Sequence, residues 1–242
     1  MKICKWLLNP IVSKGIFDNK TIPENSLASF EKAIQENYGV SFSVYVISDG
    51  TVVVFSDAQL SRLTQKDGYI KNLTAQDLEN YHLLNTQYTI PTLKQVLAFV
   101  NNRTPLLIEI VSTNKNVGFD EQKILNVLNE YNGKFAIHSR NPFTVAWFKT
   151  NAPHICRGFI NTDWNEIRKD YNSAYSEEKF SCSKKEIKNA CPQFACFSVD
   201  NLNKIRFPKN IPTLALSVSN MGQYKKAAKN ADNIVMNEKF VM

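Results

Sequence analysis

The chain has 242 residues, of which 43% are apolar and 21% charged, as in an ordinary globular protein long enough to bury a substantial core. No apolar run approaches the roughly 18–20 residues that a membrane-spanning helix needs, so we expect no transmembrane segment. The formal net charge is +7, but the lysines are scattered and no nucleic-acid-binding motif accompanies them, so we expect no nucleic-acid partner.

Short runs rich in β-branched residues predict strands along the chain. The segment 41–48 (SFSVYVIS) alternates with a period of two, and 51–55 (TVVVF) follows it after the turn Asp49-Gly50. Further strands are expected at 105–111, 134–138, 155–160, 194–199 and 212–219.

Helical patterns lie between these strands. In 24–37 apolar residues recur at helical spacing, and Thr92 is placed to cap a helix that begins at Leu93. Helices are also expected at 119–131, 142–150 and 221–230.

This alternation of strands and helices predicts a mainly parallel sheet, either doubly wound or closed into a barrel. The chain carries neither a Rossmann glycine fingerprint nor a P-loop. About eight strand candidates favour an α/β fold of the (β/α)8 TIM-barrel type, with the active site at the C-terminal ends of the strands. We expect one domain over residues 1–242, with an insertion at about 58–91; the stretch 161–190 is polar and has little periodicity.

The cysteines and the first residues bear on location. Five cysteines with irregular spacing, without a CxxC pair or a Cys/His ligand pattern, are typical of reduced thiols in a cytoplasmic protein. The apolar stretch after the basic start breaks at Asn9-Pro10, too early for a secretory signal. We therefore predict a cytoplasmic protein.

Five separated segments, in chain order, resemble the motifs of the glycerophosphodiester phosphodiesterase family. They are Pro23–Phe30 (PENSLASF), Asp49–Phe55 with Leu60–Thr64 after it, Ile90–Leu93 (IPTL), Leu107–Ile110 (LIEI) and Ala231–Ile234 (ADNI). The resemblance implies a TIM barrel with a small insertion after the early strands. It also implies a phosphoric diester hydrolase of lipid metabolism. In that family two histidines act as general acid and base, and carboxylates from an E-x-D strand and an IEIK strand hold Ca²⁺ or Mg²⁺.

This chain departs from the family at the catalytic positions. Ser13 and Ser56 stand where the two histidines are expected, and Lys14 stands at the arginine that follows the first. Ser43 and Tyr45 occupy the E-x-D positions. The resemblance therefore implies that no catalytic residue is intact.

Some groups of the implied site remain. Glu109 is retained, with Glu24 nearby, but Val111 replaces the lysine of the IEIK motif. Period-two alternation places Ser43 and Tyr45 on one strand face, which in the implied barrel is the lumen together with Glu109. Two carboxylates are too few for a cation that wants six or more oxygen ligands, so we predict no bound metal and no cofactor.

Other polar residues are candidates for ligand binding. Of the three histidines, His138 ends a strand and is expected at the barrel mouth, whereas His82 lies in the insertion and His154 is expected on the opposite rim. Arg140 is expected either to bind an anion at the mouth or to pair with a surface carboxylate. Asn25 is expected to cap or anchor the helix start.

Lys14 suggests how the site compensates for a missing cation. We hypothesise that its ammonium lies among Glu109 and Glu24 and replaces part of the lost positive charge. The predicted ligand-binding residues are Lys14, Glu24, Asn25, Ser43, Tyr45, Glu109, His138 and Arg140.

Three functions remain open. The first is a catalytically inactive, phosphodiesterase-like protein, a pseudoenzyme, that retains a pocket for a small phosphate-bearing ligand such as a lipid headgroup, or binds a protein partner. The second is a divergent but active phosphodiesterase that hydrolyses glycerophosphodiesters to glycerol 3-phosphate and an alcohol. The third is a barrel whose pocket has filled with side chains such as Tyr45 and Leu216. The sequence does not indicate how many copies of the chain assemble.

Overall fold

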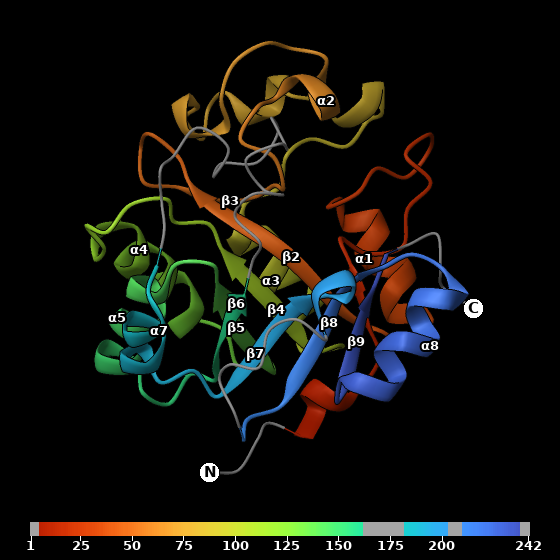
Figure 1. Cartoon of the computed structure of the whole chain (residues 1–242). Helices are drawn as coiled ribbons and strands as arrows, with labels where there is room; N and C mark the ends of the chain where they lie inside the picture. Colours follow the sequence, from red (N-terminus) through yellow and green to blue (C-terminus); the bar gives the residue numbers. More distant parts are fainter. Residues whose placement is uncertain (1–4, 162–181, 203–209, 238–242) are drawn as a thin grey trace.

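The computed structural model describes residues 5–161, 182–202 and 210–237, and its centre is a closed barrel of parallel strands (Figure 1). In order around the barrel the strands are β1 (Ile11–Ser13), β2 (Gly39–Val46), β4 (Leu106–Ile110), β5 (Phe135–Ser139), β6 (Arg157–Asn161), β7 (Phe194–Ser198), β8 (Thr213–Val218) and β9 (Asn233–Met236). The ring closes because β1 pairs with both β2 and β9. The predicted (β/α)8 architecture is confirmed.

One predicted strand lies outside the ring. Residues 51–55 do form a strand, β3 (Val52–Val54), but it pairs antiparallel with β2. A parallel return needs a crossover of a dozen or more residues, and the turn that contains Gly50 is too short for one. The short first and last strands, β1 and β9, complete the barrel instead.

Helices surround the barrel (Figure 1). They are α1 (Leu27–Gln35), α3 (Leu93–Val100), α4 (Phe119–Asn129), α5 (Pro142–Asn151), α7 (Lys184–Ala190) and α8 (Met221–Asn230). Buried apolar residues from several of these helices and from the outward faces of the strands form the largest core cluster. No helix in the described ranges is long and apolar enough to cross a bilayer.

Two helix starts show what local sequence decides. Thr92 forms the expected capping box with Gln95 at the start of α3. Of the two roles predicted for Asn25, capping α1 is not observed: Ser26 is the N-cap, and its Oγ accepts a hydrogen bond from the Ser29 N–H. Asn25 has φ +59° and lies outside the helix. In the stretch 161–190, α7 is described from its Ser183 cap onward, and residues 162–181 lie outside the described residues.

The insertion at about 58–91 is compact. It contains α2 (Ser61–Thr64) and the 3₁₀ turns η2 (Ile70–Asn72), η3 (Leu78–Asn80) and η4 (Leu83–Asn85). Its buried apolar residues form a cluster of their own that also includes Tyr45, Phe55 and Val111. The insertion is thereby packed onto the end of the barrel where β2 and β4 finish (Figure 1).

The barrel interior is filled with apolar side chains at its N-terminal end. Leu7, from the 3₁₀ turn η1 (Lys5–Leu8), packs with Ile11, Leu107 and Phe194. Gly158 makes room for Phe194, because a Cβ at Gly158 would lie 2.2 Å from the phenylalanine ring. Because apolar side chains fill the N-terminal end, the polar inward-facing residues lie at the C-terminal end of the barrel. At that end the 3₁₀ turn η5 (Val199–Asn201) follows β7.

Candidate functional site

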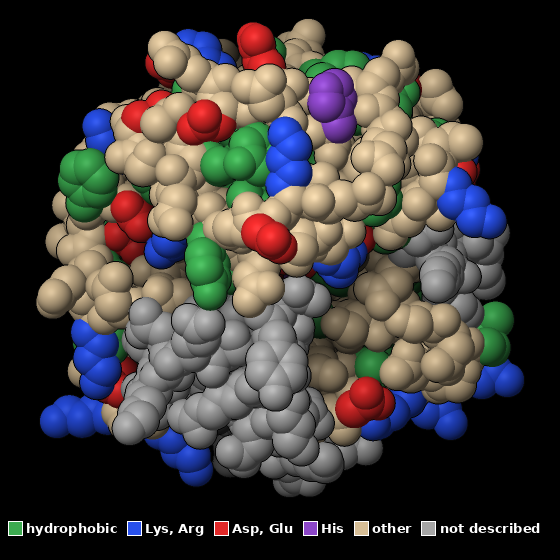
Figure 2. All heavy atoms as spheres, turned by 90° about the horizontal axis from the view of Figure 1, so that it is seen from above, with side chains coloured by type: hydrophobic (Ala, Val, Ile, Leu, Met, Phe, Trp, Pro, Cys, Tyr) green, Lys and Arg blue, Asp and Glu red, His purple; other side chains and the backbone are tan. Residues whose placement is uncertain are grey.

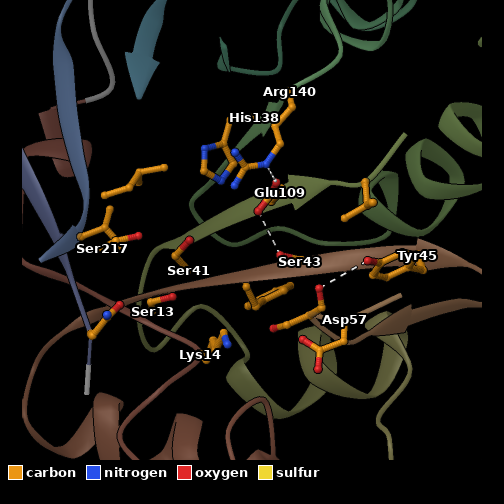
Figure 3. A pocket seen from close by; sticks show the side chains of 16 residues that line it. Ser13, Lys14, Ser41, Ser43, Tyr45, Asp57, Glu109, His138, Arg140 and Ser217 are labelled. Carbon is orange, nitrogen blue, oxygen red and sulfur yellow. Dashed lines mark hydrogen bonds and ion pairs between the residues drawn. The ribbon is translucent and has the colours of Figure 1, made fainter. Parts of the chain in front are cut away.

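A cavity of about 370 Å³ opens at the C-terminal ends of the strands (Figure 3). Its polar lining residues are Ser13, Lys14, Ser41, Ser43, Tyr45, Ser56, Asp57, Glu109, His138, Arg140, Ser217 and Asn237. Eight of these were singled out from the sequence as ligand-binding residues or family positions at the mouth, and the cavity brings them together: Ser13, Lys14, Ser43, Tyr45, Ser56, Glu109, His138 and Arg140. The predicted residues Glu24 and Asn25 are not among its lining residues.

Three neighbouring strands build one wall of the cavity. Ser43 of β2, Glu109 of β4 and His138 of β5 are register partners across adjacent strands. Ser43 Oγ donates to Glu109 Oε2 at 3.0 Å, and Arg140 Nε donates to Glu109 Oε1 at 3.0 Å (Figure 3). The expected lumenal placement of Ser43 with Glu109 is confirmed. We call Ser43, Glu109, His138 and Arg140 the Glu109 cluster.

The charges of the Glu109 cluster are set by burial and by Arg140. Burial alone would raise the pKa of Glu109, but the Arg140 guanidinium, together with the Ser43 hydrogen bond, holds that pKa below its usual value. Burial lowers the pKa of His138 to about 4, so its imidazole is neutral at pH 7. Glu109 and Arg140 therefore form an ion pair beside a neutral histidine.

His138 has one satisfied and one unsatisfied nitrogen. Its Nδ1 lies 3.3 Å from the Cys196 Sγ, inside the barrel. Its Nε2 is buried and has no hydrogen-bond partner among the described residues. Burial raises the pKa of the Cys196 thiol far above neutral pH, so Cys196 is a protonated partner of the imidazole and not a nucleophile.

Lys14 and Asp57 line the opposite wall and belong to a second group of charges, which we call the Glu24 cluster: Lys14, Glu24, Asp57 and Arg62. Glu24 Oε1 accepts hydrogen bonds from Lys14 Nζ and Arg62 Nη2, each at 2.7 Å, and Glu24 Oε2 accepts one from Arg62 Nη1 at 2.9 Å. Arg62 also holds Asp57 through its Nε and Nη2. Burial would raise the pKa of Glu24, but hydrogen bonds and charges from Arg62 and Lys14 outweigh it and lower that pKa to about 2.

The hypothesis about Lys14 holds in part. Its ammonium binds Glu24, whereas Glu109 is paired with Arg140. Lys14 and Gly15 take left-handed backbone, with φ +65° and +82°, and this turn ends β1. Arg140 does not pair with a surface carboxylate as one of its two predicted roles required: its partner is Glu109, a largely buried residue of the cavity.

The structure also places Asn25, Tyr45 and the other two histidines. Asn25 Nδ2 donates to Ser56 Oγ at 2.7 Å, so Asn25 connects the start of α1 to the segment after β3. Tyr45 is almost fully buried, and its hydroxyl donates to the Ser56 carbonyl at 3.3 Å. His82 and His154 are exposed and do not line the cavity.

Arg62 is the residue that sequence reasoning missed. It lies in the segment Leu60–Thr64, which carried part of the family resemblance. An arginine five residues after a retained aspartate was the available signal. Its contact with Glu24, 38 positions away in the chain, depends on the folded insertion.

The donor set does not fit Ca²⁺ or Mg²⁺. Both oxygens of Glu109 are engaged by Ser43 and Arg140, and the carboxylates of Glu24 and Asp57 are engaged by Arg62. Across the described ranges, three or more His, Cys, Asp or Glu side chains are nowhere grouped so as to hold a metal ion. A hard cation needs several oxygen ligands with uncompensated negative charge, and here that charge is already balanced by side chains.

The electrostatic surface near the insertion is mixed. Seen from above the insertion, acidic and basic side chains are interspersed and form no continuous field of one sign (Figure 2). The described basic side chains on this face are not grouped as a polyanion-binding surface would require.

Comparisons with known proteins agree on one family. The profile described as the glycerophosphoryl diester phosphodiesterase family matches residues 18–178. A glycerophosphodiester phosphodiesterase of Caldanaerobacter subterraneus subsp. tengcongensis is 28% identical over 153 residues, which cover 59% of this chain and 63% of that protein. A glycerophosphodiester phosphodiesterase of Bacillus altitudinis is 27% identical over 152 residues, covering 58% and 62%. The chain thus matches less than two thirds of the length of these relatives.

Solved structures share the fold. A putative glycerophosphodiester phosphodiesterase from Galdieria sulphuraria superimposes with a TM-score of 0.76 at 15% identity, covering 96% of this chain and 94% of that one. An Oleispira antarctica phosphodiesterase, solved in complex with its product sn-glycerol-3-phosphate, superimposes with a TM-score of 0.73 at 21% identity, covering 96% and 93%. At these identities the likeness concerns the fold alone.

Proposed function

Because the chain belongs to the glycerophosphoryl diester phosphodiesterase family, as the match over residues 18–178 shows, we propose that it is a family member that binds a phosphate-bearing ligand without hydrolysing it. The observation that carries the proposal is the state of the carboxylates at the barrel mouth. Glu24, Asp57 and Glu109 are each paired with an arginine, and Glu24 also with Lys14.

Hydrolysis of a phosphodiester needs proton transfer to the leaving group and from the attacking group. Ser13 and Ser56 stand at the implied histidine positions, and their hydroxyls do not titrate near neutral pH. The one histidine that lines the cavity, His138, is neutral and buried. The cavity therefore lacks a matched pair of acid and base among the residues that line it.

The cavity suits a small polar ligand. Hydroxyl and amide groups of Ser13, Ser41, Ser43, Ser217 and Asn237 line it, and its volume of about 370 Å³ is in the range of pockets for small molecules. The Oleispira antarctica phosphodiesterase binds sn-glycerol-3-phosphate on the same fold. A glycerol phosphate group, free or as part of a headgroup, is the ligand class that we propose.

A second candidate is an active but divergent phosphodiesterase. The curated relatives that bear the name glycerophosphodiester phosphodiesterase favour it, and His138 Nε2 offers a nitrogen that is not otherwise engaged among the described residues. In this alternative the reaction would release glycerol 3-phosphate and an alcohol.

One assay separates the two candidates. The purified chain is incubated with glycerophosphocholine in calcium, in magnesium and in a chelator, with the Caldanaerobacter relative as positive control, and glycerol 3-phosphate is measured. We expect no release above a protein-free blank in any condition. Release that disappears in His138→Gln and persists in His154→Gln, an exposed control, would establish the divergent enzyme.

We also propose that residues 1–242 form one domain in the cytoplasm. No disulfide joins the described cysteines 156, 182, 191 and 196, which suits a reducing compartment. Limited proteolysis tests the first point, because one domain with an insertion should resist cleavage outside exposed loops.

A further inference from the structure

The ion pairs at the mouth are asymmetric in their exposure. The Lys14 side chain is 30% exposed and its partner Glu24 only 3%; Arg62 is 35% exposed and its partner Asp57 9%. Arg140, at 23%, is also more exposed than Glu109, at 17%. In every pair the cation is the more exposed side chain, although Asp57 and Glu109 themselves line the cavity and Arg62 does not.

Two of these cations are among the residues that line the cavity. Three cations, Lys14, Arg62 and Arg140, balance three carboxylates, but Lys14 and Arg140 line the cavity from opposite walls (Figure 3). The Lys14 ammonium has three N–H donors, and its hydrogen bond to Glu24 uses one. An anion in the cavity therefore has an ammonium group on one side and a guanidinium group on the other.

The unpaired nitrogen of His138 points independently to a ligand. His138 lines the cavity, is 2% exposed, and its Nε2 has no partner among the described residues. Buried polar atoms are rarely left unpaired, since an unmade hydrogen bond at such an atom is costly. A polar ligand atom in the cavity would remove that cost.

We propose that the protein's own cations take the place of a divalent metal, so that Lys14 and Arg140 bind the oxyanion of a phosphate ester directly and His138 contacts its polar group. This inference rests on the proposed function, since it specifies how the ligand is held. A calcium ion at Glu109 would compete with Arg140 for the same carboxylate, and a displaced Arg140 would be left as an unpaired cation in a partly buried site. Ligand binding is therefore independent of divalent metal.

The same chemistry is offered by two sources, a soluble glycerol phosphate and a lipid headgroup. Titration calorimetry on the full chain compares sn-glycerol 3-phosphate, glycerophosphocholine and phosphatidylcholine vesicles. Each is titrated in a chelator and again in calcium. Binding of the soluble esters alone identifies a free metabolite, and binding of vesicles as well identifies a headgroup.

The expected result is one dissociation constant for sn-glycerol 3-phosphate in chelator and in calcium. Lys14→Met and Arg140→Met each weaken binding about tenfold or more, because each removes a charge-assisted hydrogen bond. Lys94→Met removes the same charge from an exposed ion pair with Glu130, outside the cavity lining, and leaves the dissociation constant unchanged.

Arg140→Met leaves the Glu109 carboxylate without its cation, which could impair folding. The double variant Glu109→Gln/Arg140→Met is therefore the second test. It keeps the charge balance, its folding is checked by circular dichroism, and it also loses affinity about tenfold. Binding that requires calcium overturns the metal-independent site and leaves the proposed binding function standing. Release of glycerol 3-phosphate from glycerophosphocholine overturns the proposed function, and absence of binding in both conditions overturns both.

Discussion

The Glu24 cluster and the Glu109 cluster are built on the same pattern, a buried carboxylate held by an arginine, but they serve different purposes. Arg62 of the insertion binds both Glu24 and Asp57, so the Glu24 cluster joins the insertion to the segments that follow β1 and β3. The Glu109 cluster spans β2, β4 and β5 and contains a buried nitrogen without a partner among the described residues. Arg62 therefore gives the first cluster a structural role, with only Lys14 and Asp57 of that cluster lining the cavity, whereas the second cluster is equipped to bind a ligand.

Removing the arginine of the Glu24 cluster should have the largest effect on stability. Arg62→Met leaves Glu24 and Asp57 buried without this partner, and we expect the free energy of unfolding to fall by about 2–4 kcal/mol. The value is below the 3–5 kcal/mol of a fully buried pair because Arg62 is partly exposed. Chemical denaturation measures it.

The matched control is Lys94→Met, which breaks an exposed pair with Glu130 and should cost less than about 1 kcal/mol. We also expect folded Arg62→Met to bind the ligand nearly as tightly as the wild type does, whereas Arg140→Met binds it more weakly. If Arg62→Met and the wild type had the same free energy of unfolding, the structural role of Arg62 would be contradicted.

Acid should affect the two clusters in different pH ranges. The pKa of His138 is about 4 in the folded protein and near 6.5 when unfolded, so its contribution to stability is present above pH 6.5 and is lost as the pH falls toward 4. The pKa of Glu24 is about 2 against 4.5, so its contribution is present above pH 4.5 and is lost only as the pH falls toward 2.

The histidine contribution amounts to up to about 3 kcal/mol, at 1.36 kcal/mol per pKa unit. The free energy of unfolding of the wild type, measured relative to that of His138→Gln, should fall by about that amount between pH 7 and pH 4. His154→Gln is the control, because this histidine is exposed. Parallel curves for His138→Gln and the wild type would contradict the assigned state of the buried imidazole.

The smallest expected effect is the loss of one hydrogen bond in the Glu109 cluster. Ser43→Ala removes the hydroxyl that donates to Glu109 Oε2 and should lower the free energy of unfolding by about 1–2 kcal/mol, since its acceptor is charged. Ser41→Ala, two residues earlier on the same strand face, is the control and should cost less. An equal loss for both serines would mean that Glu109 does not depend on Ser43.

The sequence was sufficient for features that depend on neighbouring residues. The helix predicted at 221–230 has those bounds in the structure, and Thr92 caps α3 as expected. Period-two alternation identified the lumenal face that carries Ser43 beside Glu109. Each of these follows from local backbone geometry, which a short segment encodes.

Features that depend on partners far along the chain were not accessible in the same way. Strand propensity identified 51–55 but not its antiparallel partner, which the short turn imposes. Neighbouring Asn25 and Ser26 are both good capping residues, and only the left-handed backbone at Asn25 decides between them. The pairing of Arg140 with Glu109 joins residues 31 positions apart and requires the assembled strands.

A crystal structure of the chain grown with sn-glycerol 3-phosphate and calcium tests the central claim most directly. The account predicts phosphate oxygens within hydrogen-bond distance of Lys14 and Arg140, with Arg140 still paired to Glu109. A calcium ion bound to Glu109, with Arg140 displaced from it, would contradict the account.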